Sequence, residues 1–399
     1  MTGFPCSQIG QHVNPVATSN PGQSESDQLF KYVDISSVDR GSKTIAGAQD
    51  VMPSLAPSRA RQIIRAGDVL VSTVRPKLNV VAWVPPALDG AIASTGFCVL
   101  RPKVSELDGR YLYHWVRTQQ FVNVMLSRAT GATYPAISDR IVMASTLPFP
   151  PLPEQRRIAA ILDKADAIRR KRQQAIQLTD DLLRSAFLDM FGDPVENPKG
   201  WPRETFAKAL GAVEAGWSAN GDDRPVQDGE WAVLKISAVT SGHFDASQHK
   251  VVAELPRDKR LLVPKRGDLL FSRANTCELV GATALVEADE DRLFLPDKLW
   301  RLIPDRSVAL PEYLRFVLGH RGYRASLAAH ATGTSGSMVN VSQAKLLRMA
   351  FPLPPIDLQT RFASLVWHTF SARDAIQRLQ VASNALFGSL VQRAFRGEL

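Results

Sequence analysis

The sequence lacks the short motifs that identify several large enzyme classes. No G-x-x-x-x-G-K-[ST] loop is present, so nucleoside triphosphate hydrolysis has no support, and no G-x-G-x-x-G follows an expected strand. No H-E-x-x-H or C-x-x-C places metal ligands together, and the seven histidines are scattered along the chain. An Asn/Asp-Pro-Pro-aromatic tetrapeptide, which would mark an amino-methyltransferase site, is also missing. We therefore predict no catalytic residue and no metal-ligating residue in this chain.

Cysteines and long apolar runs are scarce as well. The three cysteines, Cys6, Cys98 and Cys277, are far apart, which argues against a disulfide framework and fits a reducing compartment. There is no run of about 18 apolar residues that would predict a membrane-spanning helix. The opening stretch MTGFPCSQIGQHVNP lacks the basic and apolar parts of a signal peptide. We therefore expect a cytoplasmic protein.

Length and composition are those of a globular protein with several domains. The chain has 399 residues, of which 45% are hydrophobic and 22% charged, enough for two or three domains with their own cores. Its formal net charge is +9, and the excess is spread along the chain without a basic tail. Such an excess favours a polyanionic partner such as nucleic acid, but it also describes an ordinary solvated surface, so charge alone leaves both interpretations open.

An internal repeat organises the whole chain. RAGDVLVSTVRP begins at Arg65 and KRGDLLFSRANT at Lys265, while ATGATYPAIS begins at Ala129 and ATGTSGSMVNVS at Ala331. Further matched positions in the same order are Tyr111 with Tyr313, Gln155 with Gln359 and Phe191 with Phe395. Several landmarks in one order predict two copies of a unit of about 200 residues.

The first part of each copy predicts a mixed α/β (α+β) domain. Short apolar runs bounded by turn residues predict strands in DVLVSTV, VVAWV, GFCVLRP, WAVLKI, DLLFS and KLWRLIP. One helix is expected over residues 109–129 and its equivalent over 311–330. The repeated Asp68 and Asp268 are candidate catalytic carboxylates, but Asp more often closes a Gly-Asp turn through backbone hydrogen bonds, which is the interpretation we favour.

The second part of each copy predicts one long helix. Residues 154–191 contain neither proline nor glycine, and an unbroken helix of that length would be about 57 Å long. Pro153 is expected to precede the first helix, and Gly388 to weaken the last turns of the second. Apolar residues at heptad spacing predict that the two helices pair as an antiparallel coiled coil, with an approximate two-fold relation between the copies. The predicted seam comprises Ile158, Ile161, Ala165, Ile168, Ala175, Leu182, Phe362, Leu365, Ala372, Ile376, Leu379 and Leu386.

Polar loops follow the repeated strands and differ between the copies. TVRPK follows the first Gly-Asp strand and RANTC the second, and the two ATG loops also diverge. Arg and Asn make the strongest bidentate contacts to guanine and adenine, and small hydroxyl groups often bind phosphates. The predicted DNA-binding residues are Thr73, Arg75, Lys77, Arg128, Thr130, Thr133 and Tyr134 in the first copy, and Arg273, Asn275, Thr276, His330, Thr332, Thr334 and Ser335 in the second. Two ordinary polar loops are the alternative.

The chain resembles the specificity subunit of type I DNA restriction-modification systems. The motifs that carry the resemblance are the stretch from Pro151 to Pro194, the two Gly-Asp strands and the two ATG loops, and it extends over essentially all of the sequence. The resemblance implies four parts: target-recognition domain 1 over 1–150, a spacer helix over 151–194, target-recognition domain 2 over 195–351 and a second spacer helix over 352–399. The second helix departs from the motif, since PLPPIDLQTR lacks the Pro-Glu-Gln of the first.

The resemblance also implies a function and partners. Each recognition domain would contact one half of a bipartite, asymmetric site in double-stranded DNA, and the paired helices would set the spacing of the halves. Two methyltransferase subunits would dock on the helices with S-adenosylmethionine, and restriction subunits using ATP and magnesium would join them. This chain would bind no cofactor and would have no catalytic site of its own.

Two other functions remain open on the sequence alone. A structural coiled-coil assembly protein without DNA affinity would share the long helices. A nuclease with an unrecognised site would act by itself, with metal and without partners. The basic run Arg169-Arg170-Lys171-Arg172 fits phosphate contact or, as an ordinary helix surface, pairing of Asp166 with Arg170.

Overall fold

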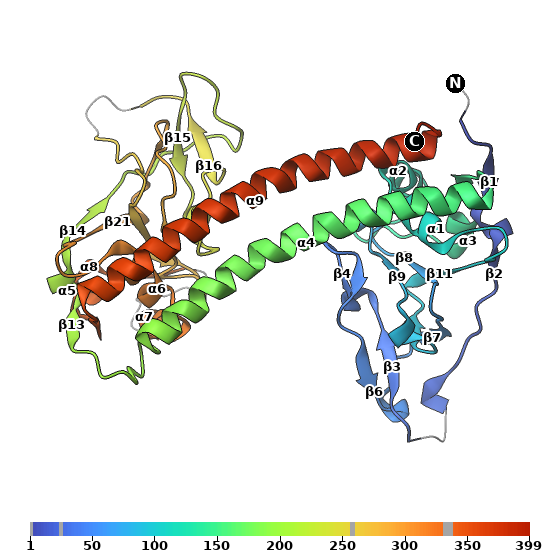
Figure 1. Cartoon of the computed structure of the whole chain (residues 1–399), viewed down its shortest axis with the longest axis horizontal. Helices are drawn as coiled ribbons and strands as arrows, with labels where there is room; N and C mark the ends of the chain where they lie inside the picture. The colour runs from blue at the N-terminus through green and yellow to red at the C-terminus, as the bar shows by residue number, and fades with distance from the viewer. Residues whose placement is uncertain (1–2, 24–26, 256–259, 330–337) are drawn as a thin grey trace. The chain divides into compact units, whose positions relative to one another are not determined.

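The structure is a computed structural model that describes residues 3–23, 27–255, 260–329 and 338–399 (Figure 1). The chain divides into two compact units: unit 1 comprises Met1–Gln174 and Gln377–Leu399, and unit 2 comprises Ala175–Ile376. The long helices α4 (Leu152–Phe191) and α9 (Ile356–Arg396) both contribute to the two units. We call the residues before α4 head 1 and those between α4 and α9 head 2.

Head 1 contains two four-stranded sheets. The first is antiparallel, in the order β2 (Val13–Asn14), β11 (Phe97–Pro102), β8 (Val69–Ser72) and β9 (Val81–Trp83). The second has the order β6 (Gln49–Val51), β3 (Phe30–Val33), β10 (Ile92–Ser94) and β7 (Ala60–Ile63), and its β3–β10 pair is parallel. A short hairpin joins β4 (Val38–Asp39) to β5 (Thr44–Ile45).

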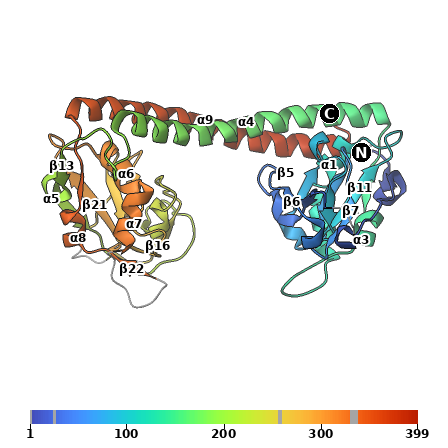
Figure 2. The same cartoon turned by 90° about the horizontal axis from the view of Figure 1, so that it is seen from below.

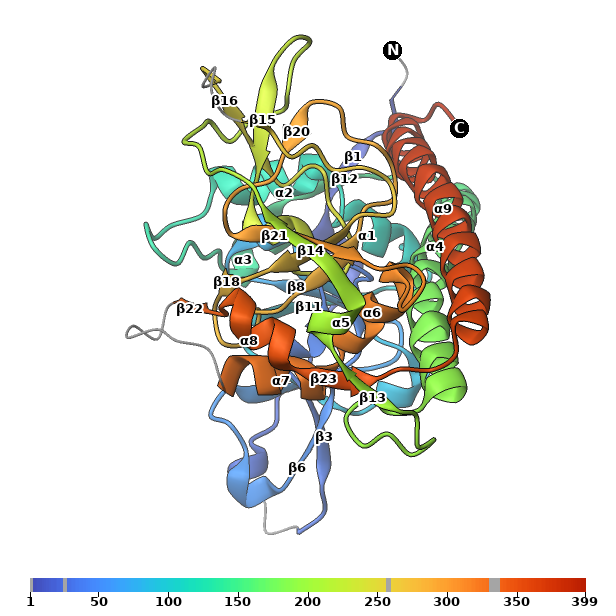
Figure 3. The same cartoon turned by 90° about the vertical axis from the view of Figure 1, so that its left-hand side faces the viewer.

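Head 2 repeats this arrangement in its described residues, except that its second sheet has three strands. Its first sheet has the order β14 (Leu210–Ala215), β21 (Leu299–Pro304), β17 (Leu269–Ser272) and β19 (Thr283–Leu285), and β14 lies beside β21 in Figure 3. Its second sheet has the order β16 (His249–Val252), β15 (Trp231–Leu234) and β20 (Leu293–Phe294), and the β15–β20 pair is again parallel. Every run predicted as a strand is a strand, and the duplicated mixed α/β fold is confirmed.

The strand after each Gly-Asp turn is buried on both faces. Because side chains alternate across a strand, Val69 and Val71 of β8 join the core beneath the helices, whereas Leu70 joins the core against the second sheet. In head 2, Leu269 and Phe271 of β17 face the helix-side core and Leu270 the other. Burial on both faces explains why these strands are continuously apolar.

The Gly-Asp turn has the role that the sequence predicts. Gly67 has a φ of +91°, and the carboxylate of Asp68 accepts a hydrogen bond from the backbone N–H of Arg65 at 2.8 Å. The same carboxylate pairs with Arg101 of β11 at 2.8 Å, which attaches the turn to the neighbouring strand. The equivalents in head 2 are Gly267, Asp268, Lys265 and Arg301.

The helix predicted after each sheet is broken in two. Residues 109–129 form α1 (Gly109–Trp115) and α2 (Gln119–Ser127), and residues 311–329 form α6 (Pro311–Gly319) and α7 (Arg321–Ala329). Thr118 causes the first break, because its side chain accepts a hydrogen bond from Phe121 N and begins a new helix as an N-cap. His320 takes an extended conformation at the same place in head 2, with ψ 136°. The single-helix prediction is therefore wrong in both copies.

Short elements lead the chain from each head into its long helix. In head 1 they are α3 (Asp139–Ala144) and β12 (Thr146–Pro148), which pairs antiparallel with β1 (Cys6–Gln8). In head 2 they are β22 (Val339–Asn340), α8 (Gln343–Arg348) and β23 (Ala350–Pro352), which pairs with β13 (Arg203–Thr205) ahead of α5 (Phe206–Ala209). The Tyr111 hydroxyl donates to Pro148 O at 2.9 Å, and the Tyr313 hydroxyl donates to Pro352 O at 2.6 Å.

The two long helices are continuous, close to the predicted limits. Pro153 lies inside the first turn of α4 and does not precede the helix, because the first turn needs no N–H from that residue. Gly388 lies within α9, which continues to Arg396. Across the described residues, no helix is long and apolar enough to cross a membrane.

Within each unit the two helix segments run antiparallel. In unit 1, the side chain of Arg157 donates a hydrogen bond to Leu399 O, and that of Arg172 donates one to Leu379 O. Residue numbers therefore increase along α4 in the direction in which they decrease along α9. In unit 2, Phe191 contacts Phe362, with ring centroids 5.3 Å apart, and Asp180 lies 3.6 Å from Arg373. The direction of pairing within each unit agrees with the prediction.

The buried face of the helices differs from the predicted heptad seam. Ile158 and Phe362 are fully buried, and Ile161, Ala165, Ala175, Leu365 and Ile376 are half-buried. The other five predicted positions, Ile168, Leu182, Ala372, Leu379 and Leu386, are exposed, with Leu182 at 52% and Leu386 at 60%. The seam is corrected there, because each helix segment buries the face that packs on a head, for example Ala159 and Leu162 against head 1.

Aromatic side chains anchor the end of each long helix. Phe191, at the end of α4, packs in the core of unit 2 with its ring centroid 4.8 Å from that of Tyr313. Phe395, near the end of α9, packs in the core of unit 1, 5.1 Å from Tyr111 and 5.0 Å from Trp115. These equivalent residues make each unit depend on both long helices.

A buried glutamine fastens the start of each long helix to its head. The Oε1 atom of Gln155 accepts a hydrogen bond from Asp108 N at 2.9 Å, and its Nε2 donates to Pro150 O and Glu106 O. Gln359 makes the equivalent bonds to Leu310 N, Pro354 O and Val308 O, and both glutamines are 0% exposed. The amide is thus fully used in both copies.

The substitution Gln155→Leu should destabilise unit 1, because it leaves buried backbone groups without partners, at about 1–3 kcal/mol each. Urea unfolding followed by tryptophan fluorescence measures the loss. Gln177→Leu, on an exposed position of the same helix, is the matched control and should leave the midpoint nearly unchanged. Equal midpoints for the two variants would contradict the role of the buried amide.

An ionic cluster reinforces the same junction in unit 1. Asp163 of α4 accepts hydrogen bonds from His114 Nε2 at 2.8 Å and from Arg110 Nε at 2.9 Å. Burial raises the pKa of Asp163, but the bonds from His114 and Arg110 outweigh it and lower this pKa to about 2. Burial lowers the pKa of His114 below its ordinary value, although Asp163 opposes the shift. In unit 2, Glu312 and Trp367 occupy the corresponding positions and are joined by a 2.6 Å hydrogen bond.

Unit 1 should lose stability as the pH falls. Because the pKa of folded His114 is lowered, the unfolded chain binds a proton first, and stability declines as the pH falls below about 6.5. The contribution of Asp163 is present above its ordinary pKa and is lost as the pH falls towards 2. Thermal melting between pH 7 and 5 should show a declining midpoint, and His114→Gln should flatten it. The control His368→Gln, on an exposed position, should retain the slope.

Candidate nucleic-acid interface

The polar loops that the sequence singles out lie where the Gly-Asp strands end, as far as the structure describes them; residues 330–337 of the second ATG loop lie outside the described residues. In head 2 this is the region of β22, on the side of the head away from α4 and α9 in Figure 2. In each head, the strand exit is attached to the segment that follows the ATG loop. The backbone of Val74 bridges to Ala136 in head 1, and β18 (Ala274–Asn275) pairs with β22 in head 2.

Arg75 is the centre of this region in head 1. Its backbone takes a left-handed conformation, with φ +50°, and its N–H donates to Pro135 O at 2.7 Å. Its guanidinium carbon lies 4.6 Å from the centre of the Tyr134 ring, a cation–π distance. Both side chains are exposed, Tyr134 by 64%. Arg75 therefore has a sterically costly backbone conformation and a guanidinium that stacks on Tyr134, and this planar cation lies at the surface.

The ATG loop of head 1 is closed by its own backbone. Thr130 and Ala136 exchange hydrogen bonds, N–H to O at 3.0 and 2.9 Å, and Gly131 between them has a φ of +98°. The remaining predicted residues Arg128, Thr130, Thr133 and Lys77 are exposed. The structure therefore brings six of the seven residues predicted in head 1 to the surface around the strand exit.

Thr73 is the exception and is corrected. It is 7% exposed, its hydroxyl donates to Gly96 O at 3.0 Å, and its carbonyl accepts from Ile137 N at 2.8 Å. Thr73 therefore holds the strand exit to the core, because a buried hydroxyl with a backbone partner offers nothing to a ligand at the surface.

In head 2 the equivalent of Thr73 is Arg273, and the side chain lies differently. Its backbone makes the matching bonds, from its own N–H to Lys298 O and from Val341 N to its carbonyl. Its guanidinium is half-buried, donates from Nε to Asp297 O at 3.1 Å and lies 3.6 Å from the Asp297 carboxylate. The same backbone position thus holds a paired cation in one head and a buried hydroxyl in the other.

Of the other predicted residues of head 2, the structure describes Asn275 and Thr276. Asn275, the equivalent of Arg75, is half-buried, and its Oδ1 accepts a hydrogen bond from Thr276 N at 2.9 Å. Thr276 is exposed. Four further predicted residues lie outside the described residues: His330, Thr332, Thr334 and Ser335.

The basic run in the middle of α4 is largely paired. Asp166 is fully buried and lies 2.9 Å from Arg169 and 3.5 Å from Arg170, and it also receives Arg117 of head 1 at 3.3 Å. Burial raises the pKa of Asp166, but the charges of Arg117, Arg169 and Arg170 lower it overall. The predicted pairing of Asp166 with Arg170 is confirmed.

Some structural partners were missed at the sequence level. Arg101 and Arg301, which pair with the Gly-Asp carboxylates, are 200 positions apart, so the repeat itself contained the signal. Asp297, the partner of Arg273, has no such signal because it comes from another loop. Among the residues with described coordinates, no group of three or more His, Cys, Asp or Glu side chains is placed to hold a metal ion.

Comparisons with known proteins agree with the geometry. Residues 59–178 match the family model of the type I restriction modification DNA specificity domain. The EcoKI specificity subunit of Escherichia coli K12 is 28% identical over 328 residues, 76% of this chain and 68% of that subunit. The EcoEI specificity subunit of Escherichia coli is 28% identical over 285 residues, 67% of this chain and 46% of that subunit.

Solved structures show the same fold along the whole chain. A chain from a structure of the type I R-M system, solved for complex assembly and conformational transition, has a TM-score of 0.55 and 26% identity, covering 100% of this chain and 99% of that one. The type I restriction-modification S subunit of M. genitalium has a TM-score of 0.60 at 12% identity, over 98% and 96% of the two chains, and shows the fold alone. The resemblance found in the sequence is confirmed: this chain is similar to the specificity subunits of type I restriction-modification systems, and its residues 59–178 match their DNA specificity domain.

Proposed function

We propose that this chain is the DNA-reading subunit of a type I restriction-modification complex, in which each head reads one half of a bipartite, asymmetric site. The observation that carries the proposal is one backbone frame present twice with different side chains at its strand exits. Thr73 and Arg75 of head 1 correspond to Arg273 and Asn275 of head 2, within the same backbone bonds. Two heads with one frame and different surface groups suit two different half-sites.

The side chains at the exits have the chemistry of base and phosphate contacts. Arg75 presents a guanidinium fork stacked on Tyr134, and Asn275 presents an amide at the equivalent place. Arg suits guanine and Asn suits adenine in the major groove, whereas the exposed Thr130 and Thr133 suit phosphates.

The long helices are proposed to set the spacing of the half-sites and to dock partner subunits. In unit 1 the exposed apolar side chains Leu379 and Leu386 lie on α9, and in unit 2 the exposed Leu178, Leu182 and Leu188 lie on α4. Apolar groups that a helix leaves in water are typical of protein interaction sites. We propose two methyltransferase subunits as these partners, with restriction subunits joining them.

The chemistry of the complex is assigned to those partners. Methyl transfer to adenine would use S-adenosylmethionine on the methyltransferase subunits, and DNA cleavage would use ATP and magnesium on the restriction subunits. This chain would be non-catalytic and would bind none of these cofactors. A coiled-coil assembly protein without DNA affinity, and a nuclease acting alone, are the competing functions.

The methylation pattern tests the function most directly. When this chain is expressed with its methyltransferase in a host without other methylation, sequencing of methylated adenines should reveal an interrupted, asymmetric motif. A host with the methyltransferase alone is the control and should show none. A continuous palindrome, or no new methylation, would count against the proposal, and DNA cleavage by the purified chain alone would favour the nuclease.

Two arginine substitutions test the reading by separate heads. Arg75→Ala should weaken binding through one half-site and Arg273→Ala through the other, each by about 1–3 kcal/mol if the side chain contacts a base. Titration of the complex with DNA altered in either half-site measures this, with the exposed Arg140→Ala as the control. An equal loss of affinity on every DNA sequence would show that the arginine contacts a phosphate and not a base.

A further inference from the structure

Each unit contains a pocket at the junction of its head with the long helices. The pocket of unit 2 has a volume of about 400 Å³, and that of unit 1 about 860 Å³. In both units three segments form the walls. They are a long helix, a loop that follows β3 in head 1 or β15 in head 2, and the break between the two head helices. The shared wall segments are 183–188, 240–243 and 319–321 in unit 2, and 387–392, 40–43 and 117–119 in unit 1.

The two pockets occupy equivalent places in the repeat. Adding 200 to residues 40–43 gives 240–243, adding 202 to 117–119 gives 319–321, and subtracting 204 from 387–392 gives 183–188. These are the offsets at which the repeat matches elsewhere in the sequence. The pocket is therefore a feature of the duplicated unit and arises in both copies.

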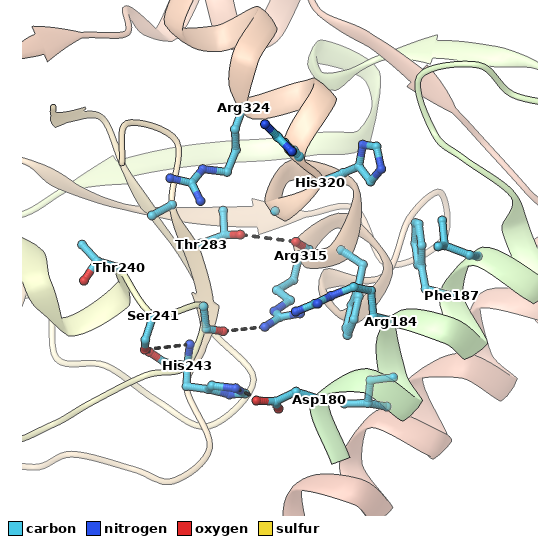
Figure 4. A pocket seen from close by; sticks show the side chains of 17 residues that line it. Asp180, Arg184, Phe187, Thr240, Ser241, His243, Thr283, Arg315, His320 and Arg324 are labelled. Carbon is cyan, nitrogen blue, oxygen red and sulfur yellow. Dashed lines mark hydrogen bonds and ion pairs between the residues drawn. The ribbon is translucent and has the colours of Figure 1, made fainter. Parts of the chain in front are cut away.

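Basic side chains line the pocket of unit 2. Its lining includes Arg184 of α4 and Arg315, Arg321 and Arg324 of the head helices, and Asp180 is the acidic lining residue. Figure 4 labels Asp180, Arg184, Arg315 and Arg324. Within the described residues, no carboxylate lies at ion-pair distance from Arg315, Arg321 or Arg324. Burial and the charges of Arg373 and Arg184 lower the pKa of Arg315 to about 10, although the charges of Asp180 and Glu287 oppose the shift.

The acidic group of this pocket is already engaged. Asp180 lies 2.9 Å from His243 Nε2 and 3.6 Å from Arg373, so it compensates cations at the edge of the pocket. Arg315 donates to the backbone carbonyl of Gly242, a neutral partner, at 2.6 Å. The Nε atom of Arg324 is buried and, among the described residues, has no hydrogen-bond partner. The pocket thus keeps donors and positive charge that its own residues do not neutralise.

The pocket of unit 1 is basic by means of other residues. Arg40, Lys43, Arg117, Arg169 and Arg396 line it, and no Asp or Glu is among its lining residues. Arg117 and Arg169 are paired with Asp166, whereas Arg40, Lys43 and Arg396 have no carboxylate at ion-pair distance in the described part of the chain. Burial and the charges of Arg117 and Arg169 lower the pKa of Lys43 to about 8.

The positive charge is kept although its positions have changed. Arg184 corresponds to Gly388, Arg315 to Tyr113, and Arg117 to Gly319, so the cations come from different sites on the same frame. If these cations served structural ion pairs, each cation and its carboxylate partner would be present at equivalent positions in both copies. Charge that is retained in the pocket through different residues indicates a shared anionic ligand.

The walls favour a phosphate group among anions. α2 begins at Gln119 and α7 at Arg321, so each pocket includes the N-terminus of a nine-residue helix, whose dipole favours anions. One N–H of each terminus is already used, since Phe121 N donates to the Thr118 hydroxyl and Gly322 N to His320 Nδ1. Thr240 and Ser241 add hydroxyl groups in unit 2. Arginine forks, hydroxyls and a helix N-terminus together are typical of phosphate recognition.

We propose that each junction pocket binds a phosphate group, one in each unit. The phosphate comes either from the backbone of duplex DNA, a source that rests on the proposed function, or from free phosphate. The two sources share one chemistry and are separated by experiment.

The first arm uses the purified chain and inorganic phosphate. Phosphate at low millimolar concentration should raise the melting temperature relative to chloride at equal ionic strength. The double variants R184Q/R321Q and R40Q/R396Q should each weaken phosphate binding by about tenfold, since each removes two cations from one pocket. The control R156Q/R361Q removes two exposed arginines of the long helices that do not line either pocket and should behave as the parent chain.

The second arm uses the complex with its methyltransferase and duplex DNA. If the phosphates are those of DNA, each double variant should reduce the slope of log affinity against log salt by about 1, equally on all sequences, with base preference unchanged. Loss of the phosphate effect in the first arm with unchanged DNA affinity identifies free phosphate as the ligand.

Two results would overturn the proposal. Pocket variants that match the control in both arms would show that the pockets bind no phosphate. Variants that lose a protein partner while keeping phosphate and DNA binding would assign the pockets to an acidic protein segment. If the parent complex binds no specific DNA, the proposed function fails by itself, and the first arm still decides the pockets.

Discussion

The hydrogen bonds of one buried amide hold the architecture together in each unit. Gln155 and Gln359 each satisfy three backbone groups at the point where the chain leaves a head and enters a long helix. Without the amide, these backbone groups would be buried without partners. The free energy lost would be a large part of a protein's net stability. The first turn of each helix is consequently fixed to its head.

The repeat preserves the backbone and permits the side chains to diverge. The Gly-Asp turn, the parallel strand pair and the glutamine are the same in both copies. At the same junction, however, Arg110 and Asp163 form an ion pair in unit 1, whereas Glu312 and Trp367 form a hydrogen bond in unit 2. The frame therefore tolerates charge or aromatic packing at one place, provided that each buried polar group retains a partner. This tolerance allows the surface of each head to be specialised independently.

The sequence predicted the elements whose signals are local or repeated. The strand after Gly67, the long helices and the role of Asp68 follow from apolar runs, the absence of breakers and turn chemistry. The break at Thr118 was missed, since a single N-cap within an apolar pattern is a weak signal beside the periodicity of the whole segment. The heptad seam was partly wrong because two surfaces, a head and a helix, compete for the apolar faces of α4. Thr73 looked accessible because burial of a loop hydroxyl depends on segments distant in the chain. The junction pockets have no local signal in the sequence, since each is built from three segments distant in the chain.

The aromatic anchors at the helix ends separate chain order from structural order. Unit 2 is built from the continuous stretch 175–376, whereas the core of unit 1 includes Phe395 from the far end of the polypeptide. A ribosome therefore delivers all residues of unit 2 before it delivers the last core residues of unit 1. Part of the apolar surface of head 1, which is synthesised first, therefore stays uncovered until the last turns of α9 have been synthesised.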